Sequence, residues 1–266
     1  MPWQPGLPLW GVFAATVGLV LGAVCAGYLL GRRHPRRTEE GKVPSVSQIV
    51  GAMLTLASLL LAFTFGIAQS RFETRRDLVL DEANSIGMTW LRAGLLSDPH
   101  RSQLRKLLRE YLEVRLRATQ TDQLQQLPQE IANSEELQGR LWAEASIIGQ
   151  KDPSSEMAAL FVASLNELVN LHARRVHFGL RTRIAVNIWA ALYLITLISL
   201  AMLGYYAGLT GARPFFSMFL AVLTFSIALI LIVDLDRPAE GLLKTNHQAL
   251  VDLRKLINGP LSADSK

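Results

Sequence analysis

The stretch VPSVSQIVGAMLTLASLLLAFTFGIAQS, residues 43–70, carries no charged side chain, and RFETRRDLVLDEANSIGMTWLRAGLL, residues 71–96, follows it directly. A helix rises 1.5 Å per residue, so about 20 apolar residues cross the hydrocarbon core of a bilayer. The first strong helix-breaking signal after Pro44 is the triplet Ser97-Asp98-Pro99. We therefore expect one helix that spans the membrane and continues into water.

Three further blocks without charge cover residues 2–31, 184–212 and 214–233. Inside lipid, backbone N–H and C=O groups must be paired within their own segment, so these blocks are also expected to be helices. The sequence thus predicts an all-α protein whose four transmembrane helices form two hairpins, with a helical bundle inserted between spans two and three. The expected spans are 7–30, 46–69, 184–206 and 214–233, separated by a basic loop at 31–45 and a soluble bundle at 70–183, and followed by a C-terminal tail at 234–266.

The composition supports a membrane protein. Half of the 266 residues are hydrophobic and only 18% are charged, whereas about a quarter is usual for soluble domains. The net charge of +5 comes from arginines beside the spans, where they contact phospholipid headgroups. No nucleic-acid-binding signature is present. The single cysteine excludes an internal disulfide and a cysteine-based zinc cluster.

The soluble segment is expected to contain four helices. Asp98-Pro99 and Asp152-Pro153 indicate helix starts, because aspartate caps a helix and proline suits its first turn. A third helix is expected from about Ser134 to Ile148. The fourth is expected to run directly into span three.

The loop GLTGAR between spans three and four is short enough to force a hairpin, which places both termini on the same side as the soluble bundle. That side carries nine flanking Lys and Arg residues, against six on the other. The positive-inside rule then favours a cytoplasmic bundle and cytoplasmic termini.

Span two holds the residues that suggest a pore. Thr55, Leu59 and Phe63 follow one another at intervals of four and lie nearly in line along the helix. Around the axis of an oligomer they could form a narrow apolar constriction that gates by excluding water. The same spacing also suits a closely packed helix interface, and the hydroxyls of the spans also suit interhelical hydrogen bonds.

Basic residues next to the spans suggest a second element of the same site. Arg71, Arg75 and Arg174 could focus positive potential in a hydrated vestibule that attracts small anions. The fourth bundle helix carries Asn166, Asn170, Arg174 and His177 as a polar file. The alternative for all these polar groups is hydrogen bonding and ion pairing between helices.

No catalytic residue, metal site or cofactor is predicted. An enzyme would need a nucleophile beside a base, and no such motif is visible. The spans contain no acidic or basic side chain of the kind that proton-coupled pumps use. With an enzyme and a proton-coupled pump excluded, a passive pore and a non-conducting scaffold remain as possible functions.

Several motifs resemble the bestrophin-like family of bacterial membrane proteins. They are LLLAFTFGIAQSRF, RRDLVLDEANSIG, LRAGLL, LRKLLREYLEVR and DLDRP, and together they extend from about residue 45 to 238. The resemblance implies a passive, chloride-like anion channel in the bacterial inner membrane, assembled as a homo-oligomer, with a pentamer favoured, and lined by span two.

The more distant bestrophin channels supply the residue assignments. Arg71, Phe72, Arg75 and Asn84 match the segment that follows the pore-lining span in those channels, and their neck positions then fall on Phe63, Leu59 and Thr55. Thr55 departs from the apolar pattern of the neck. Asp234, Asp236 and Glu240 are too few for the six to eight oxygen ligands that calcium prefers, so no calcium is expected.

The alternative function is a membrane scaffold or sensor that does not conduct. In that case the helical bundle would bind a partner, and span two would be a packed interface rather than a pore.

Overall fold

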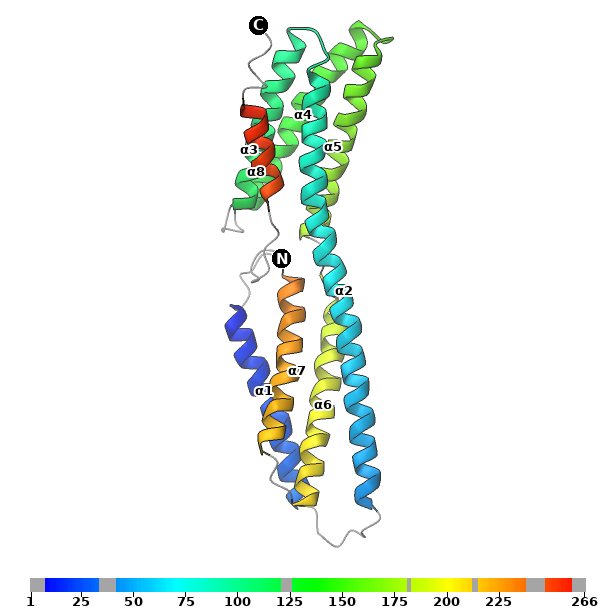
Figure 1. The fold of residues 1–266 in the computed structure, drawn as a ribbon, viewed down its shortest axis with the longest axis vertical. Helices are drawn as coiled ribbons and strands as arrows, with labels where there is room; N and C mark the ends of the chain where they lie inside the picture. Colours follow the sequence, from blue (N-terminus) through cyan, green and yellow to red (C-terminus); the bar gives the residue numbers. More distant parts are fainter. Residues whose placement is uncertain are drawn as a thin grey trace. The chain divides into compact units, whose positions relative to one another are not determined.

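The computed structural model describes residues 8–33, 42–120, 126–180, 183–211, 215–237 and 247–259. Within these residues the protein is entirely helical, which confirms the predicted fold class. The helices, labelled in Figure 1, are α1 (Leu9–Arg33), α2 (Lys42–Ala93), α3 (His100–Gln120), α4 (Leu127–Lys151), α5 (Glu156–Leu180), α6 (Val186–Thr210), α7 (Phe215–Asp236) and α8 (Gln248–Asn258).

The chain divides into two compact units. The span unit consists of Pro5–Phe72 and Arg183–Leu243, and the bundle unit consists mainly of Glu73–Thr182 and Lys244–Lys266. α2 contributes to both units as one helix of 52 residues. Its continuity through residue 93 confirms the expectation that no break separates span two from the helix after it.

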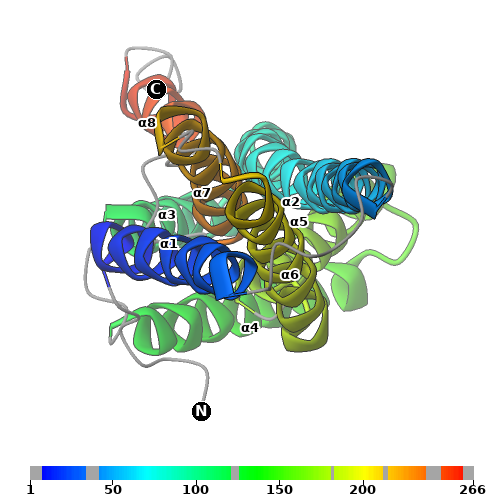
Figure 2. The same cartoon turned by 90° about the horizontal axis from the view of Figure 1, so that it is seen from below.

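Among the described residues, four helices are long and apolar enough to cross a membrane, as the sequence predicts: α1, α2, α6 and α7. In the views of Figures 1 and 2, α6 lies between α1 and the first part of α2. The Ser199 hydroxyl on α6 donates to the Met53 carbonyl of α2 at 3.1 Å, which links these two helices.

Glycines allow α1 and α6 to pack backbone against backbone. A Cβ added at Gly27 or Gly31 on α1 would overlap the Ala201 or Tyr205 carbonyl oxygen of α6. Two glycines on α6, Gly204 and Gly208, face α1 in the same way. Both pairs have the small-xxx-small spacing that lets membrane helices approach closely.

The turn between α6 and α7 begins at Gly211, whose φ of 68° is the left-handed conformation that glycine adopts without strain. At the other end of the hairpin the Ile184 N–H donates to the Asp236 carboxylate at 3.0 Å. The chain is extended at Ala185, where ψ is 140°, and α6 starts afresh at Val186. The expectation that the fourth bundle helix runs directly into span three is therefore wrong.

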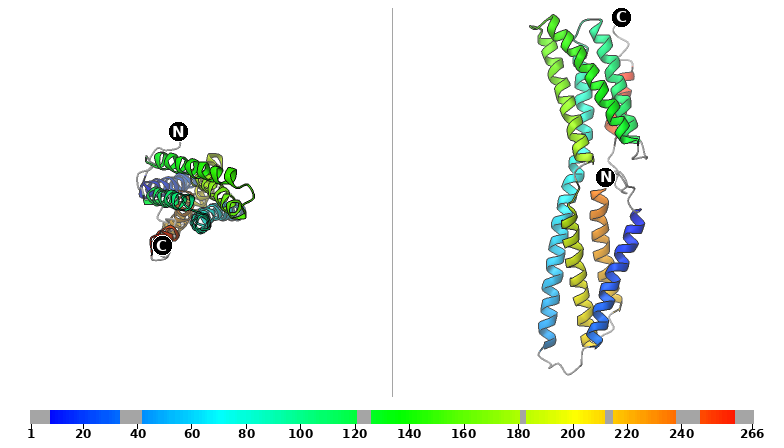
Figure 3. Two further views of the ribbon diagram at one scale, coloured as in Figure 1. Left: turned by 90° about the horizontal axis from the view of Figure 1, so that it is seen from above. Right: turned by 180° about the vertical axis from the view of Figure 1, so that it is seen from behind.

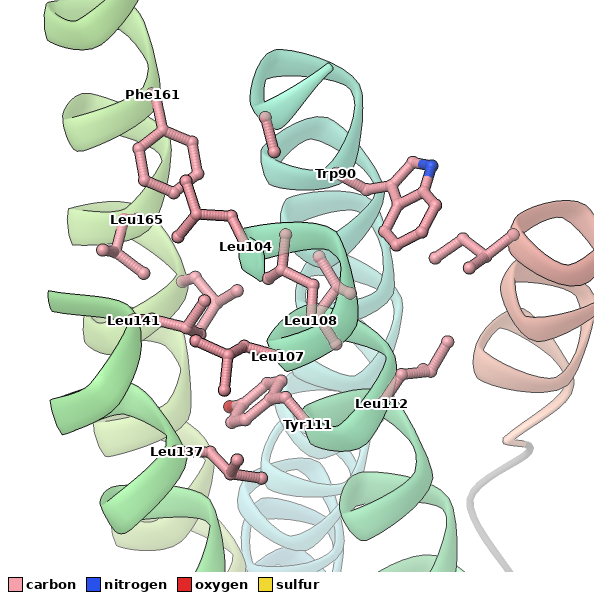
Figure 4. Packing of buried hydrophobic residues seen from close by; sticks show 14 of the residues in the cluster. Trp90, Leu104, Leu107, Leu108, Tyr111, Leu112, Leu137, Leu141, Phe161 and Leu165 are labelled. Carbon is pink, nitrogen blue, oxygen red and sulfur yellow. The ribbon is translucent and has the colours of Figure 1, made fainter. Parts of the chain in front are cut away.

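The bundle unit contains the second part of α2 together with α3, α4, α5 and α8 (Figure 3). Its core is a single apolar cluster to which all five helices contribute (Figure 4). α8 adds Leu250 and Ile257 to that cluster, and Leu253 contacts α2 at Gly87. The residues from 248 to 258 thus form a packed helix within the segment that the sequence left as a tail.

Two helix starts in the bundle differ from expectation. Asp98 caps α3 as predicted, since its carboxylate accepts bonds from the backbone N–H and hydroxyl of Ser102. At α5, however, Ser155 Oγ accepts the Ala158 N–H, and Asp152 ends α4 instead. α4 itself begins at Leu127, seven residues before the expected start, because Pro128 suits the first turn of a helix.

Candidate functional site

α2 uses one face of its membrane span to pack against its own chain. Val50, Ala57, Leu61, Thr64 and Ala68 are buried and recur every three, four or seven residues, which places them on one side of the helix. Leu61 and Ala68 belong to a cluster with residues of α6 and α7. This side of α2 is the interface that holds it in the span unit.

The three predicted pore residues lie on the opposite side of α2. Two residues of helix rotate a side chain by about 200°, so Leu59 and Phe63 point away from Leu61. Leu59 is 50% exposed and Phe63 is 63% exposed, and Thr55 is also exposed. The Thr55 hydroxyl donates to the Gly51 carbonyl at 2.9 Å, so its proton is already used within the helix.

The three basic candidates have different surroundings. Arg71 is half-buried, and its Nη1 atom is buried without a hydrogen-bond partner within the described residues. Arg75 is buried at the start of the bundle unit, whereas Arg174 is exposed on α5. Arg71 belongs to the span unit, whereas Arg75 and Arg174 belong to the bundle unit.

A buried ion-pair network lies inside the bundle. Glu82 of α2 has no exposed surface, and its two carboxylate oxygens pair with different arginines. Arg115 Nε of α3 donates to one oxygen at 2.7 Å, and Arg175 of α5 pairs with the other. Burial lowers the pKa of Arg175 to about 10, so this guanidinium stays charged at neutral pH, and burial also lowers the pKa of Arg115. One carboxylate thus joins three helices.

Polar side chains extend this network from Arg115. Arg115 Nη1 lies 3.4 Å from the Ser134 hydroxyl of α4. The buried Tyr111 hydroxyl accepts a bond from Gln138 at 3.1 Å and lies 3.3 Å from His172 Nδ1. Burial, together with the charge of Arg115, lowers the pKa of His172 to about 3. His172 is therefore neutral at physiological pH.

A second histidine at the edge of α8 shows the same effect. Burial, followed by the charges of Arg175 and Arg115, lowers the pKa of His247 to about 4. Both histidines remain neutral at physiological pH mainly because burial disfavours the charged imidazolium, and the charge of Arg115 lowers each pKa further.

The sequence analysis did not identify Arg115 or His172 as members of a buried network. The available signal was position: Arg115 follows Tyr111 by four residues on the buried stripe of α3, where an apolar side chain is expected. The polar file on α5, by contrast, lies on the surface, since all four of its members, Asn166, Asn170, Arg174 and His177, are exposed.

Among the described residues, no group of three or more His, Cys, Asp or Glu side chains is placed to hold a metal ion. The ion pairs of the buried network join helices, and His172 Nε2 is buried without a hydrogen-bond partner among the described residues. The face of α2 opposite its packed side is exposed among the described residues.

A helical span unit with a helical bundle inserted into it defines a class of membrane protein. Comparison with known proteins identifies that class. The family model of the bestrophin-like domain matches residues 17–250. The chain therefore belongs to the bestrophin-like family.

Solved structures share the fold at low sequence identity. A variant of a bacterial bestrophin homologue from Klebsiella pneumoniae has 13% identity and a TM-score of 0.64, covering 97% of this chain and 99% of its own. A second variant from the same organism has 16% identity and a TM-score of 0.63, covering 94% and 99%. A variant described as a membrane protein has 13% identity and a TM-score of 0.61, covering 94% and 97%. The comparison with curated proteins gave no match.

Proposed function

We propose that this protein is a passive ion channel of the bacterial inner membrane, formed by several identical copies with α2 of each copy lining a central pore. The observation that carries the proposal is the two-sided character of α2. One side is buried against α6 and α7, while the opposite side, with Thr55, Leu59 and Phe63, is exposed in the part of the chain that the structure describes. Membership of the bestrophin-like family supports a channel-like role.

The proposed constriction works by dewetting. Leu59 and Phe63 cannot replace the hydration shell of an ion, so a narrow ring of these side chains raises the barrier to conduction. Thr55 fits this scheme better than its residue type suggests, because its hydroxyl proton is held by the Gly51 carbonyl and its methyl group is free to line the pore.

Small anions are the proposed permeant ions. Arg71, Arg75 and Arg174 would supply positive potential at the cytoplasmic mouth, and the bundle and both termini would lie in the cytoplasm. Arg75 is buried and would act through the field rather than by contact. Replacing Arg71 with Gln should therefore shift the reversal potential in a chloride gradient toward lower anion preference.

The test is anion flux into liposomes from the purified oligomer. Replacing Phe63 with Ala removes a ring from every subunit at the constriction, so flux should rise above that of the wild type. Phe219 on α7 is the matched control, because it is a similarly exposed phenylalanine, at 53%, on a helix that is not proposed to line the pore. Phe219→Ala should leave flux unchanged.

Absence of flux from the wild type and from Phe63→Ala would contradict the channel and support the scaffold. A stable monomer in detergent would also contradict it, because four spans of one copy leave no room for the proposed central pore.

A further inference from the structure

α2 and α5 lie side by side and antiparallel in the bundle unit (Figure 3). Three contacts fix how their residues correspond along the bundle: Arg175 with Glu82, the Thr89 hydroxyl with the Ser164 carbonyl at 3.2 Å, and Arg92 Nη1 with the Leu160 carbonyl at 3.0 Å. Residues near Glu82 on α2 are thus level with residues near Arg175 on α5, and residues near Arg92 are level with residues near Leu160.

The outer face of α2 changes from acidic to apolar along this unit. Asp77 and Asp81 are exposed near the level of Glu82. Further along the same side of the helix, Met88 and Leu91 are exposed three residues apart, and Leu95 is exposed in the turn that follows the end of α2 at Ala93, with Leu91 at 59% and Leu95 at 56%. We call this surface the α2 outer face.

The outer face of α5 changes from apolar to basic along the bundle, which complements the apolar and acidic ends of the α2 outer face. Met157 and Leu160 are exposed at the level of Leu91 and Leu95. Arg174 is exposed at the level of Asp81. We call this surface the α5 outer face.

Identical copies in one membrane have the same orientation. Residues at the same height along the bundle in two neighbouring copies can therefore contact each other. We propose that the α2 outer face of one copy packs against the α5 outer face of the next, with Leu91 and Leu95 against Leu160 and Met157, and Asp81 beside Arg174. Such a contact joins two different surfaces and repeats around a ring, as closed cyclic assemblies require. The inference rests on the proposed function, because it assumes that the channel is a homo-oligomer.

Lipid cannot cover the α2 outer face in the bundle unit. The segment between Phe63 and Met88 contains several charged residues, including the buried ion pair of Glu82, so the helix has left the apolar part of its span. Soluble surfaces rarely expose a contiguous row of large apolar side chains unless another protein covers it. The acidic and basic ends of the two faces specify a second copy as that cover. The contact also assigns Arg174 to the subunit interface, which leaves the half-buried Arg71 as the basic candidate nearest the span that is not fully buried.

Cross-linking between copies tests the interface. In a Cys25→Ala background, copies with Leu95→Cys and copies with Met157→Cys carry different tags and are co-expressed, so that no cross-link can form within one chain. The expected product is the mixed dimer that contains both tags. The control replaces Met157→Cys with Ile147→Cys, an exposed residue on α4, and should give no mixed dimer above background. A dimer of two Leu95→Cys copies without the mixed product would overturn the proposal, because Leu95 would then lie beside the same residue of another copy rather than beside α5.

Charge reversal tests the other end of the interface. Asp81→Arg and Arg174→Asp should each reduce the oligomeric fraction in detergent, and the two together should restore it, since the charges then pair with exchanged signs. Glu136→Arg, an exposed reversal on α4, should have no effect. Failure of the double variant to recover, with Asp81→Arg and Arg174→Asp each impaired, would overturn the contact. An intact oligomer that conducts but shows neither the cross-link nor the charge effects removes only this inference, whereas a monomeric wild type removes the proposed function as well.

Discussion

Glu82 is the residue on which the bundle interior most depends. Its carboxylate is fully buried between Arg115 and Arg175, and removal of one partner of a buried pair leaves the other charge without compensation. The cost falls here on two cations at once, because both arginines lose the same partner.

Replacing Glu82 with Gln should therefore lower the free energy of unfolding by about 3–5 kcal/mol. Chemical denaturation of the purified protein, followed by circular dichroism, measures the change. Glu136→Gln is the control, since Glu136 is exposed on α4 and should give the wild-type curve. Equal midpoints for the two variants would show that the arginines do not need this carboxylate.

His172 makes the stability of the bundle depend on pH. Its pKa is lowered from 6.5 to about 3 in the folded state, so the unfolded chain binds the proton first as pH falls. Stability is then fully present above pH 6.5 and is lost progressively between 6.5 and about 3. Between pH 7 and pH 5 the loss from this residue should approach about 2 kcal/mol.

Thermal unfolding at pH 7 and pH 5 checks this dependence. The carboxylates whose pKa values are lowered, Asp98 and Asp252, titrate below this window and do not contribute to it. A His172→Gln variant should show a smaller decrease between the two pH values than the wild type. An identical decrease in both proteins would mean that His172 binds a proton as readily in the folded protein as in the unfolded chain.

At the scale of the elements, glycine spacing determines the contact between α1 and α6. Gly204 lies against the Val24 carbonyl of α1, and an added Cβ would overlap that oxygen. By contrast, a Cβ at Gly22 on α1 would meet open space. The same substitution at the two positions thus separates close packing from helix propensity.

Gly204→Ala should lower the melting temperature in detergent, at a cost of about 1–3 kcal/mol for overpacking. Gly22→Ala should be neutral or slightly stabilising, because alanine favours the helix by up to about 1 kcal/mol. A Gly204→Ala protein that melts with or above the wild type would contradict backbone contact between α1 and α6.

The helices could be predicted from the sequence where their formation depends on residues close to one another in the chain. Runs without charge give the four spans, because a bilayer excludes charged side chains and unpaired backbone groups. The start of α5 was not predictable in the same way, because Asp152 and Ser155 can each cap a helix and only the observed geometry selects Ser155. The break before α6 depends on the Asp236 carboxylate, which lies 52 residues away in the chain.

The candidate site shows the same division between local and distant determinants. The exposed position of Thr55, Leu59 and Phe63 agrees with their helical spacing, but spacing alone does not say which side of α2 is packed. That depends on Leu61 and Ala68 meeting α6 and α7. The partner of Glu82 was unpredictable for a related reason, since Arg115 and Arg175 come from two helices that the sequence does not pair.

At the scale of the whole molecule, we propose that copies of α2 surround a conducting pore and expose Phe63 to it. The most direct measurement uses Phe63→Cys in a Cys25→Ala background and records the ionic current before and after addition of a charged, water-soluble thiol reagent. A residue in the pore reacts with the reagent, and the attached charge changes conductance in every modified subunit.

Phe219→Cys on α7 is the control, because its exposed side chain should face lipid, where a charged reagent has no access. The reagent should alter the ionic current of the Phe63→Cys protein and leave the current of the Phe219→Cys protein unchanged. A current that does not respond at Phe63→Cys, in a protein that conducts and whose cysteine remains unmodified, would place the pore elsewhere and contradict the claim.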